Sequence, residues 1–367
     1  MINVLIDGRP IREPLAGVAV FVKELVKALI ENENEPTIFL QSDKEKNRHL
    51  DGLTYNKKII SNGSRFLENI CYEFFYDSKL LSNFKNYIVH ETYFSRMPVS
   101  FEKKITTIHD VIPLDHPDWF SFSNRFFSRR NFFRQASESN SLVFPSNYSL
   151  ERAHNFFDIK AKSIVIPLAV SNAIHNAKLS YNNKIISNNE NPYVLMVGNI
   201  EPRKNIALTA EAIGVINKRL NLDLDLVLIG KNVFGAEDII QSARIALGKD
   251  PICLGFVSES KKIEMYQKCA CHVYASKYEG FGFPPIESLI IGAPTVIAAN
   301  TSLIDNIPNH FFSFESDNLE SLIEAISRNL FKDPADILST NFDSFANKYH
   351  WNNVAKNYLD VYKSLSD

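Results

Sequence analysis

The sequence predicts an α/β protein built from two Rossmann-like, doubly wound domains that face a central cleft. Short apolar runs rich in β-branched residues alternate with helical patterns, which is typical of parallel sheets with helices on both faces. The alternation occurs in two series separated by a polar, asparagine-rich stretch at 171–192, and the length of 367 residues exceeds that of most single domains. Because such sheets bind ligands at the carboxyl ends of their strands, the cleft is the expected site.

The first series predicts an N-terminal domain at 1–172. A strand at 2–7 opens this domain, and the apolar spacing of the next segment predicts a helix at Val18–Glu31. Further strands are expected at 37–41, 86–90, 104–110, 141–146 and 163–170.

The second series predicts a C-terminal domain at 193–345, reached through a linker at 173–192. The last segment, 346–367, has the apolar spacing of a helix in WNNVAKNYLDVYKSL. The strands of the second domain are expected at 193–199, 224–230, 251–257, 271–276, 293–299 and 310–316.

Composition argues against several classes of protein. A hydrophobic content of 45% and a charged content of 22% are typical of globular proteins, and the net charge of −2 provides no basic field for nucleic acid. No apolar run approaches the roughly 18 residues of a membrane-spanning helix, and the N-terminus begins as a strand rather than a signal peptide. Cys269 and Cys271 form a C-x-C without a second pair, which argues against zinc. A cytoplasmic protein is expected.

The segment SKYEGFGFPPIESL follows the strand at 271–276 and places two glutamates eight residues apart. Its glycines permit close approach of the backbone to a ligand, and its two prolines suit the first turn of a helix, in which Glu287 should also lie. The amides at such a helix start favour a phosphate, and the two oxygens of a carboxylate match a vicinal diol. Glu287 could therefore grip a ribose while Glu279 meets the other end of the same ligand. A strand–loop–helix with a capping glutamate is the structural alternative.

The segment VGNIEPRKN places two adjacent cations, Arg203 and Lys204, after the first strand of the second domain. Cations beside a helix start would neutralise a diphosphate leaving group. Taken alone, Pro-Arg-Lys-Asn is more often a solvated turn, and its place after the first strand of the domain that carries the glutamate loop makes it specific.

The segment NRFFSRRNFFRQA at 124–136 interleaves arginines with four phenylalanines. Arginine pairs at i, i+4 spacing on an amphipathic helix favour anionic lipid or a lipid-linked diphosphate acceptor. The alternative is a helix that packs its phenylalanines on the first sheet and leaves its arginines solvated. The arginines concerned are Arg125, Arg129, Arg130 and Arg134.

Three segments of the second half carry a resemblance to a known family. VGNIEPRKN, LGFVSESKKIEMYQKCA and ASKYEGFGFPPIESLIIGAPTVIAAN resemble the donor-binding half of the family 4 retaining glycosyltransferases of GT-B fold, with Glu279 and Glu287 as their E-x7-E pair. The first half resembles the same family more loosely, through DGRPIREPLAGVAVFVKEL, TIHDVIPLDHP and FPSNYSLERAHNFF. The terminal helix of this family returns to the N-terminal domain, and the same is expected here.

The resemblance implies a nucleotide-sugar donor and a role for each candidate residue. Glu287 would bind the ribose, Glu279 the transferred sugar, and Arg203 and Lys204 the diphosphate, while His109 would face the sugar. Of these, His109, Glu279, Arg203 and Lys204 would be catalytic. Further donor contacts would come from strand ends and glycine loops: Gly17, Gly198, Asn199, Val257, Gly280, Phe281, Gly282 and Phe283.

Two positions leave alternatives open. Family members often continue the first loop as Gly-x-Gly-Arg-Tyr, whereas Gly17 is followed here by Val18 and Ala19, so contacts from the first domain would be weaker or supplied differently. His109 is also compatible with a structural histidine that bonds to a neighbouring backbone group.

The resemblance further implies the chemistry. Retention would proceed by front-face attack without a covalent enzyme intermediate. The residues themselves argue against a metal, because the candidate Asp-x-Asp, Asp223–Asp225, precedes its strand, so Arg203 and Lys204 would take the place of a metal and no cofactor is expected. The combination of His-Asp-x-x-Pro with Gly-Asn-Ile-Glu-Pro-Arg-Lys-Asn is most similar to the O-antigen mannosyltransferases of lipopolysaccharide synthesis. It implies GDP-mannose as donor and a lipid-linked oligosaccharide as acceptor, with the enzyme peripheral at the inner membrane face.

Three alternatives to this function stay open. Another GDP-, UDP- or dTDP-sugar could be the donor. A phosphorylase-like enzyme of the same fold would carry a lysine-bound pyridoxal motif, and none is evident. A non-catalytic sugar-nucleotide-binding subunit would bind the donor without hydrolysing it.

Overall fold

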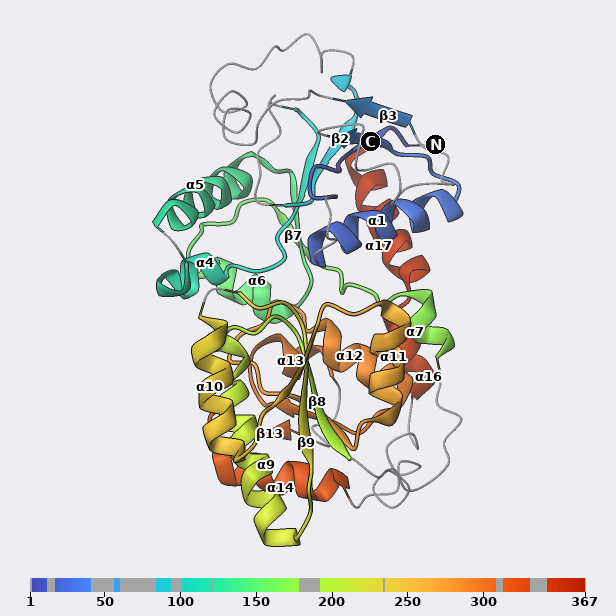
Figure 1. The fold of residues 1–367 in the computed structure, drawn as a ribbon. Coiled ribbons are helices and arrows are strands. Elements are labelled where there is room, and N and C mark those ends of the chain that lie inside the picture. Colours follow the sequence, from blue (N-terminus) through green and yellow to red (C-terminus); the bar gives the residue numbers. More distant parts are fainter. Residues whose placement is uncertain are drawn as a thin grey trace. The chain divides into compact units, whose positions relative to one another are not determined.

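The protein consists of two α/β units (Figure 1). The first comprises Met1–Ala169 and Tyr349–Asp367, and the second comprises Val170–Lys348. The predicted fold class, with two doubly wound parallel sheets, is confirmed. The computed structural model describes residues 2–11, 17–40, 56–59, 84–93, 101–120, 122–177, 192–233, 235–307, 313–330 and 342–366.

The sheet of the first unit has seven parallel strands in the order β3-β2-β1-β4-β5-β6-β7. Its central strands are short and buried along their whole length, as expected where helices cover both faces. The strand order reverses between β1 and β4, which defines the switch point of this sheet. The strands are β1 (Val4–Asp7), β2 (Thr37–Leu40), β3 (Asn56–Ile59), β4 (Ile88–Glu91), β5 (Lys104–Thr107), β6 (Ser141–Phe144) and β7 (Lys162–Val165).

The helices of the first unit include the last helix of the chain, α17 (Trp351–Ser366), which packs against α1 (Gly17–Glu31) and β4. The helix α1 begins one residue before the predicted start, and its apolar residues face the core. The other helices are α4 (Ile112–Asp115), the 3-10 turn η2 (Pro117–Trp119), α5 (Phe122–Glu138) and α6 (Asn147–His154).

A buried polar network joins α17 to the sheet. The Nδ1 atom of His90 lies 2.8 Å from the hydroxyl of Tyr362, and its Nε2 lies 2.7 Å from Oγ1 of Thr107. The same Thr107 oxygen lies 2.9 Å from the hydroxyl of Tyr358, whose ring stacks on the imidazole. Both histidine nitrogens therefore have partners in a place that water does not reach.

The sheet of the second unit has six parallel strands in the order β10-β9-β8-β11-β12-β13, with its switch point between β8 and β11. Residues 310–312 of the predicted last strand lie outside the described residues. The strands are β8 (Tyr193–Val197), β9 (Asp225–Ile229), β10 (Ile252–Gly255), β11 (Cys271–Tyr274), β12 (Thr295–Ala298) and β13 (Ser313–Phe314).

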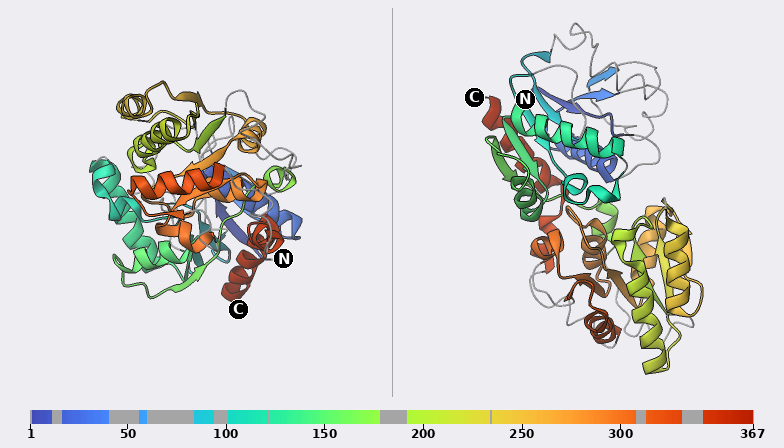
Figure 2. Two further views of the ribbon diagram at one scale, coloured as in Figure 1. Left: turned by 90° about the horizontal axis from the view of Figure 1, so that it is seen from below. Right: turned by 90° about the vertical axis from the view of Figure 1, so that its left-hand side faces the viewer.

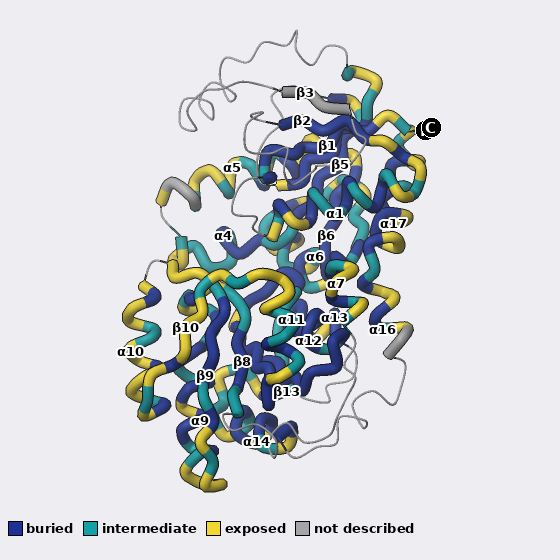
Figure 3. The backbone as a smooth tube through the Cα atoms, turned by 45° about the vertical axis from the view of Figure 1, so that its right-hand side comes forward, coloured by how far each residue is buried: buried dark blue, intermediate teal, exposed yellow. Residues whose placement is uncertain are grey.

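Helices cover both faces of this second sheet (Figures 1 and 2). Residues of α9, α10 and α14 share one apolar cluster with the strands, whereas α11 and α12 pack together on the other face. Buried positions follow the strands other than the edge strand β10, and exposed positions gather on β10 and on the outer turns of α9 and α10 (Figure 3). The helices are α7 (Asn172–Asn176), the 3-10 turn η3 (Pro202–Lys204), α9 (Ile206–Leu220), α10 (Ala236–Leu247), α11 (Glu259–Lys268), α12 (Phe283–Ile291), α13 (Thr301–Asn306), α14 (Leu319–Leu330) and α16 (Phe342–Lys348).

The first unit ends at Ala169 and resumes at Tyr349, each three residues from the expected limits of 172 and 346, whereas the second unit begins at Val170 and includes the expected linker. The expected linker at 173–192 holds most of α7, and its residues 178–191 lie outside the described part. In the ranges that the structure describes, no helix has the length and apolarity needed to cross a membrane.

Candidate functional site

The candidate site lies at the carboxyl ends of β8 and β11, on either side of the switch point of the second sheet. The chain leaves β8 through Gly198 and enters the turn η3, which carries Arg203 and Lys204. The amide of Lys277, just after β11, donates to the carbonyl of Arg203 at 2.8 Å. This bond fixes the turn that bears the cations against the loop that bears Glu279.

Glu279 joins the two cations. Its Oε1 accepts from Nη1 of Arg203 at 2.5 Å, from Nζ of Lys204 at 2.5 Å and from Oγ of Ser276 at 2.7 Å. Arg203 also donates to the carbonyl of Tyr278 at 2.8 Å, and its Nη2 lies 2.7 Å from Oε1 of Glu201. The structure therefore brings together three of the residues predicted to be catalytic, in one hydrogen-bonded cluster.

The charge of this cluster is balanced and largely withdrawn from water. Glu279 is 8% exposed and Lys204 is 7% exposed. Burial by itself would raise the pKa of Glu279, but the charges of Lys204 and Arg203 outweigh it and lower that pKa to about 2. Glu279 is thus a carboxylate at neutral pH. With Glu201 counted, two acids offset two cations.

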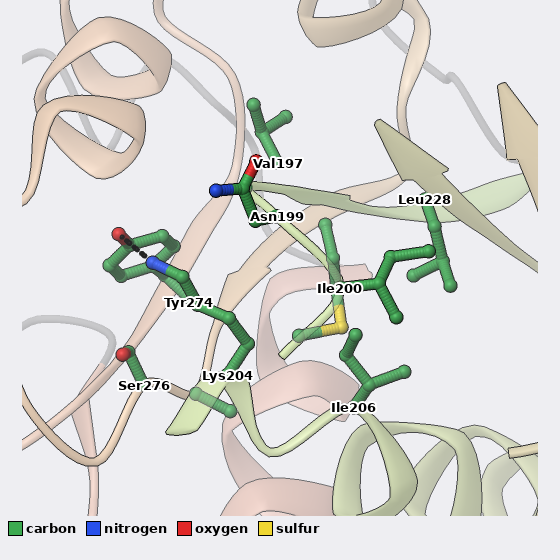
Figure 4. A pocket seen from close by; sticks show the side chains of 11 residues that line it. Val197, Asn199, Ile200, Lys204, Ile206, Leu228, Tyr274 and Ser276 are labelled. Carbon is green, nitrogen blue, oxygen red and sulfur yellow. Dashed lines mark hydrogen bonds between the residues drawn. The ribbon is translucent and has the colours of Figure 1, made fainter. Parts of the chain in front are cut away.

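Lys204 has a second partner, Tyr274, the last residue of β11. Its Nζ lies 2.8 Å from the tyrosine hydroxyl, the contact drawn as a dashed line in Figure 4. The two residues line a small pocket between the strand ends, together with Gly198, Asn199 and Ser276. Its remaining lining is mostly apolar: Met196, Val197, Ile200, Ile206, Leu228 and Ala275.

Glu287 lies on α12 and faces α11. Its Oε1 is 2.7 Å from Nζ of Lys262, and its Oε2 accepts from the hydroxyl of Tyr266 at 3.1 Å. The expectation that Glu287 lies in the first helical turn is wrong, because α12 begins at Phe283 and Glu287 is its fifth residue. Glu287 is 9% exposed, and a cation and a hydroxyl hold its carboxylate in one orientation.

The start of α12 offers few amides to an anion. Pro284 and Pro285 occupy the first turn as predicted, and neither carries an N–H group. Gly282 precedes the helix with a φ of 90°, a conformation that favours glycine, and a Cβ there would lie 2.5 Å from Leu303. Gly280 and Phe281 are buried, and the carbonyl of Phe281 accepts from Asn306 at 2.8 Å. The loop is therefore a fixed part of the second unit.

His109 follows β5 in the first unit. Its Nε2 lies 3.1 Å from the carbonyl oxygen of Thr92, and its ring packs edge-on against Phe21. Burial lowers its pKa to about 4, although the backbone bond to Thr92 opposes that shift. The bond is the one expected of a structural histidine, and the predicted role toward the sugar stays a prediction.

Two predicted donor-binding residues, Gly17 and Val257, lie on elements that do not carry the Glu279 cluster. Gly17 is exposed and forms the first residue of α1 in the first unit. Val257 lies in the loop after β10 and is half-buried, next to Phe256, which is 68% exposed. Their contacts with a donor stay predictions.

The four arginines proposed for an acceptor or membrane lie on α5 in the first unit. Arg129 and Arg130 are exposed, whereas Arg125 and Arg134 are half-buried. Arg134 pairs with Glu138 at 2.7 Å, and Arg125 lies 3.9 Å from Asp118.

Four residues that hold the site's side chains in place were not predicted from the sequence. Tyr274 and Ser276 hold Lys204 and Glu279, and Lys262 and Tyr266 hold Glu287. A signal for the second pair exists, because positions 262 and 266 are four residues apart on one helix and so share a face. Nothing in the sequence indicates that this face meets Glu287.

In the described part of the chain, no group of three or more His, Cys, Asp or Glu side chains is placed to hold a metal ion. Cys269 and Cys271 are buried free thiols. Independence of metal stays a prediction.

The sequence is similar to those of known glycosyltransferases. Residues 178–348 match the family described as "Glycosyl transferases group 1". The O-antigen chain mannosyltransferase B of Escherichia coli is 23% identical over 388 aligned positions, which cover 99% of this chain and 100% of that protein.

Solved structures with the same architecture span the whole chain. Sucrose-phosphate synthase from Thermosynechococcus elongatus superposes with a TM-score of 0.75 at 17% identity, covering 100% of this chain and 99% of the other. Anabaena HepE, solved in complex with UDP and glucose, gives a TM-score of 0.72 at 14% identity and covers 99% of this chain and 100% of its own. These similarities extend the shared fold over both units.

Proposed function

We propose that this chain, a hexosyltransferase of GT-B fold that resembles the O-antigen mannosyltransferases, transfers mannose from GDP-mannose to a lipid-linked oligosaccharide. The reaction would serve O-antigen or other surface polysaccharide synthesis at the cytoplasmic face of the inner membrane. One observation carries the proposal: Glu279, Arg203 and Lys204 form a buried charged cluster at the switch point of the second sheet. This is where open α/β sheets bind nucleotides.

The charge balance of the cluster suggests how the donor is held. In the structure, both cations are engaged by Glu279, so little positive charge is left for a diphosphate. We infer that Glu279 turns toward the sugar hydroxyls when the donor binds, which frees Arg203 and Lys204 for the diphosphate. Recognition of the sugar and neutralisation of the leaving group would then depend on one carboxylate.

Glu287 would bind the ribose at the other end of the donor. Lys262 and Tyr266 hold its carboxylate in place, so less conformational freedom is lost when a diol binds.

Departure of the diphosphate leaves an oxocarbenium-like centre and a growing negative charge. Cations fixed before the reaction stabilise that charge without reorganisation during it. Arg203 and Lys204 supply such charge in the proposed mechanism, which therefore runs without a metal. The acceptor hydroxyl bonds to the anomeric carbon from the side of the leaving diphosphate as the bond to that diphosphate breaks, and it gives its proton to the departing phosphate oxygen. The anomeric configuration is thereby retained, and no glycosyl–Glu279 intermediate forms.

A panel of nucleoside diphosphates tests the donor. A nucleotide that binds the folded protein raises its thermal unfolding temperature, and the shift grows with affinity. We therefore expect a larger shift with GDP than with UDP, dTDP or ADP. A larger shift with another nucleotide would overturn the choice of GDP and leave the transferase assignment intact.

Slow hydrolysis of the donor tests catalysis itself. We expect release of mannose from GDP-mannose without acceptor, and its loss in Lys204→Ala. Tight binding of GDP-mannose with no hydrolysis and no transfer would instead identify a non-catalytic binding subunit. A trapped covalent adduct on Glu279 would rule out the front-face mechanism.

A further inference from the structure

The helices α9 and α10 lie side by side on one face of the second sheet (Figures 1 and 2). Between them runs an open groove with a volume of about 520 Å³. Its floor is formed by lining residues that are buried or half-buried, namely Gly214, Val215 and Ala246. Ile245 of α10 also lines the groove and is 72% exposed. An apolar side chain thus projects into solvent beside a hollow that another apolar side chain could fill.

Gly214 fixes how the two helices lie against each other. A Cβ on Gly214 would lie 2.6 Å from the carbonyl oxygen of Ala246, so the helices nearly touch there and a side chain would push them apart. The helices also run in the same direction, because each connects two neighbouring parallel strands of one sheet. Ile245, next to Ala246, therefore lies at the same level along the helices as Gly214.

Two opposite charges line the groove, one on either side of this level. Glu211 and Lys218 are both exposed and lie seven residues apart on α9, on one face of the helix and about 10 Å apart along its axis. Among the residues that the structure describes, neither has an ion-pair or hydrogen-bond partner. The next residue, Arg219, by contrast pairs with Glu320 at 3.0 Å. The groove therefore offers one acid and one base to a partner.

A second copy of this chain fits that pattern. In a twofold contact, a residue that touches another in the partner is matched by the reverse contact. If the axis crosses α9 at right angles midway between positions 211 and 218, the two α9 helices lie antiparallel. Glu211 of each copy then meets Lys218 of the other. The same axis passes at the level of Ile245, so that Ile245 of each copy enters the groove of the other. Charge and shape both complement themselves.

We propose that the groove between α9 and α10 is the contact surface of a homodimer, with Ile245 at its centre and two Glu211–Lys218 pairs at its ends. The inference concerns the second unit alone and depends neither on the donor nor on the acceptor proposed above. The two helices are about 22 and 18 Å long, which makes the contact small for a permanent dimer. The dimer is therefore reversible, with a dissociation constant in the micromolar range.

Sedimentation velocity of the full chain tests whether the dimer exists. Over a concentration range of about 1 to 100 µM, in which a contact of this size is expected to associate, the sedimentation coefficient should rise from that of a monomer toward that of a dimer. Ile245→Asp should weaken the association tenfold or more, because a carboxylate would lose water at the centre of the contact. A monomer throughout this range, or unaltered association of Ile245→Asp, would overturn the proposal.

Charge reversal tests how the two copies are arranged. Glu211→Lys and Lys218→Glu each place like charges together twice in the dimer, so each should weaken it tenfold or more. An equimolar mixture of the two variants should associate again, because every contact then joins opposite charges. The double variant, with both reversals in one chain, should also recover. Full association of the single variants, or no recovery in the mixture and the double variant, would reject this arrangement.

Matched controls come from α14, where Glu324 and Arg328 pair with each other at 2.8 Å and are 65% and 74% exposed. Glu324→Lys and Arg328→Glu make the same changes of charge away from the groove and should leave the dimer as it is in the parent chain. Far-ultraviolet circular dichroism and thermal unfolding check that every variant folds. An equal loss of association in these controls would show a general effect of charge and overturn the proposal.

Discussion

At the scale of single residues, the feature that matters most is the shared oxygen of Glu279. One carboxylate oxygen accepts from Arg203, Lys204 and Ser276, in a place where charges are costly to leave unpaired. Any change to one member of this cluster therefore alters the others. The sequence predicted three members of the cluster and their proximity to a strand end, but it did not predict that they neutralise each other.

The variant Glu279→Gln tests whether Glu279 competes with the donor for the cations. Loss of its charge should free Arg203 and Lys204, so GDP is expected to bind several-fold more tightly in calorimetry, while sugar transfer falls tenfold or more. Lys204→Ala is the matched contrast, with weaker GDP binding and a lower kcat, because it removes charge that holds the diphosphate in both ground and transition states. Weaker GDP binding in both variants would reject the competition.

The variant Glu287→Ala tests the ribose role. Calorimetry should show GDP binding weakened by about 1–3 kcal/mol, the range for hydrogen bonds to a charged group. Lys262→Met should weaken it less, since the carboxylate keeps the hydroxyl of Tyr266. Equal affinity of the parent and Glu287→Ala would remove this residue from the nucleotide site.

At the scale of elements, the backbone segments that follow β8 and β9 in the second sheet pack closely against each other at Gly198 and Gly230. Gly230 has a φ of 154°, and a Cβ on it would lie 1.9 Å from the carbonyl oxygen of Gly198. We therefore expect Gly230→Ala to destabilise the second unit by several kcal/mol, measured by urea unfolding, because the obstacle is backbone and cannot turn aside.

Gly17→Ala is the contrast to Gly230→Ala. A Cβ at Gly17 meets no atom within 4 Å, so the fold should tolerate it. Loss of donor binding in a stable Gly17→Ala protein would support close approach of a ligand there. A stable Gly230→Ala protein would contradict the described packing of the strand ends.

The elements that the sequence predicted correctly are those with a strong local pattern. Continuous apolar runs identified the buried strands, and helical spacing identified α1 within one residue. The strand β3 was missed, because NKKI has neither an apolar run nor alternation and it forms the edge of its sheet. Glu287 lies just beyond the first turn in which it was expected, since two successive prolines do not specify which residue begins a helix.

At the scale of the whole molecule, each unit contains a fully buried histidine. Burial lowers the pKa of His90 and of His272 to about 3. In the unfolded chain both would titrate near 6.5, so below that pH the unfolded state takes up protons that the folded state does not. Their contribution to stability is complete above about pH 6.5 and is lost as the pH falls toward 3.

Thermal and urea unfolding at pH 7.5 and 5.5 check this pH dependence. Each histidine should remove about 1.4 kcal/mol of stability at pH 5.5, or about 3 kcal/mol for the two. His272→Leu provides the control, because neither ring nitrogen of His272 has a hydrogen-bond partner among the described residues. That variant should lose the acid sensitivity of the second unit only. If His272→Leu lost as much stability at pH 5.5 as the parent does, the lowered pKa of His272 would be contradicted.

The terminal helix α17 also has a practical consequence. The polypeptide passes from the first unit to the second near Ala169 and returns near Tyr349, so the first unit is assembled from two distant pieces of the gene product. A protein truncated after Ala169 would lack α17. The apolar surfaces of α1 and β4 that α17 covers would then be exposed to solvent, and His90 would lose its partner Tyr362. Isolating that half for study would require 349–367 to be spliced back onto it, whereas 170–348 can be excised as one uninterrupted insert.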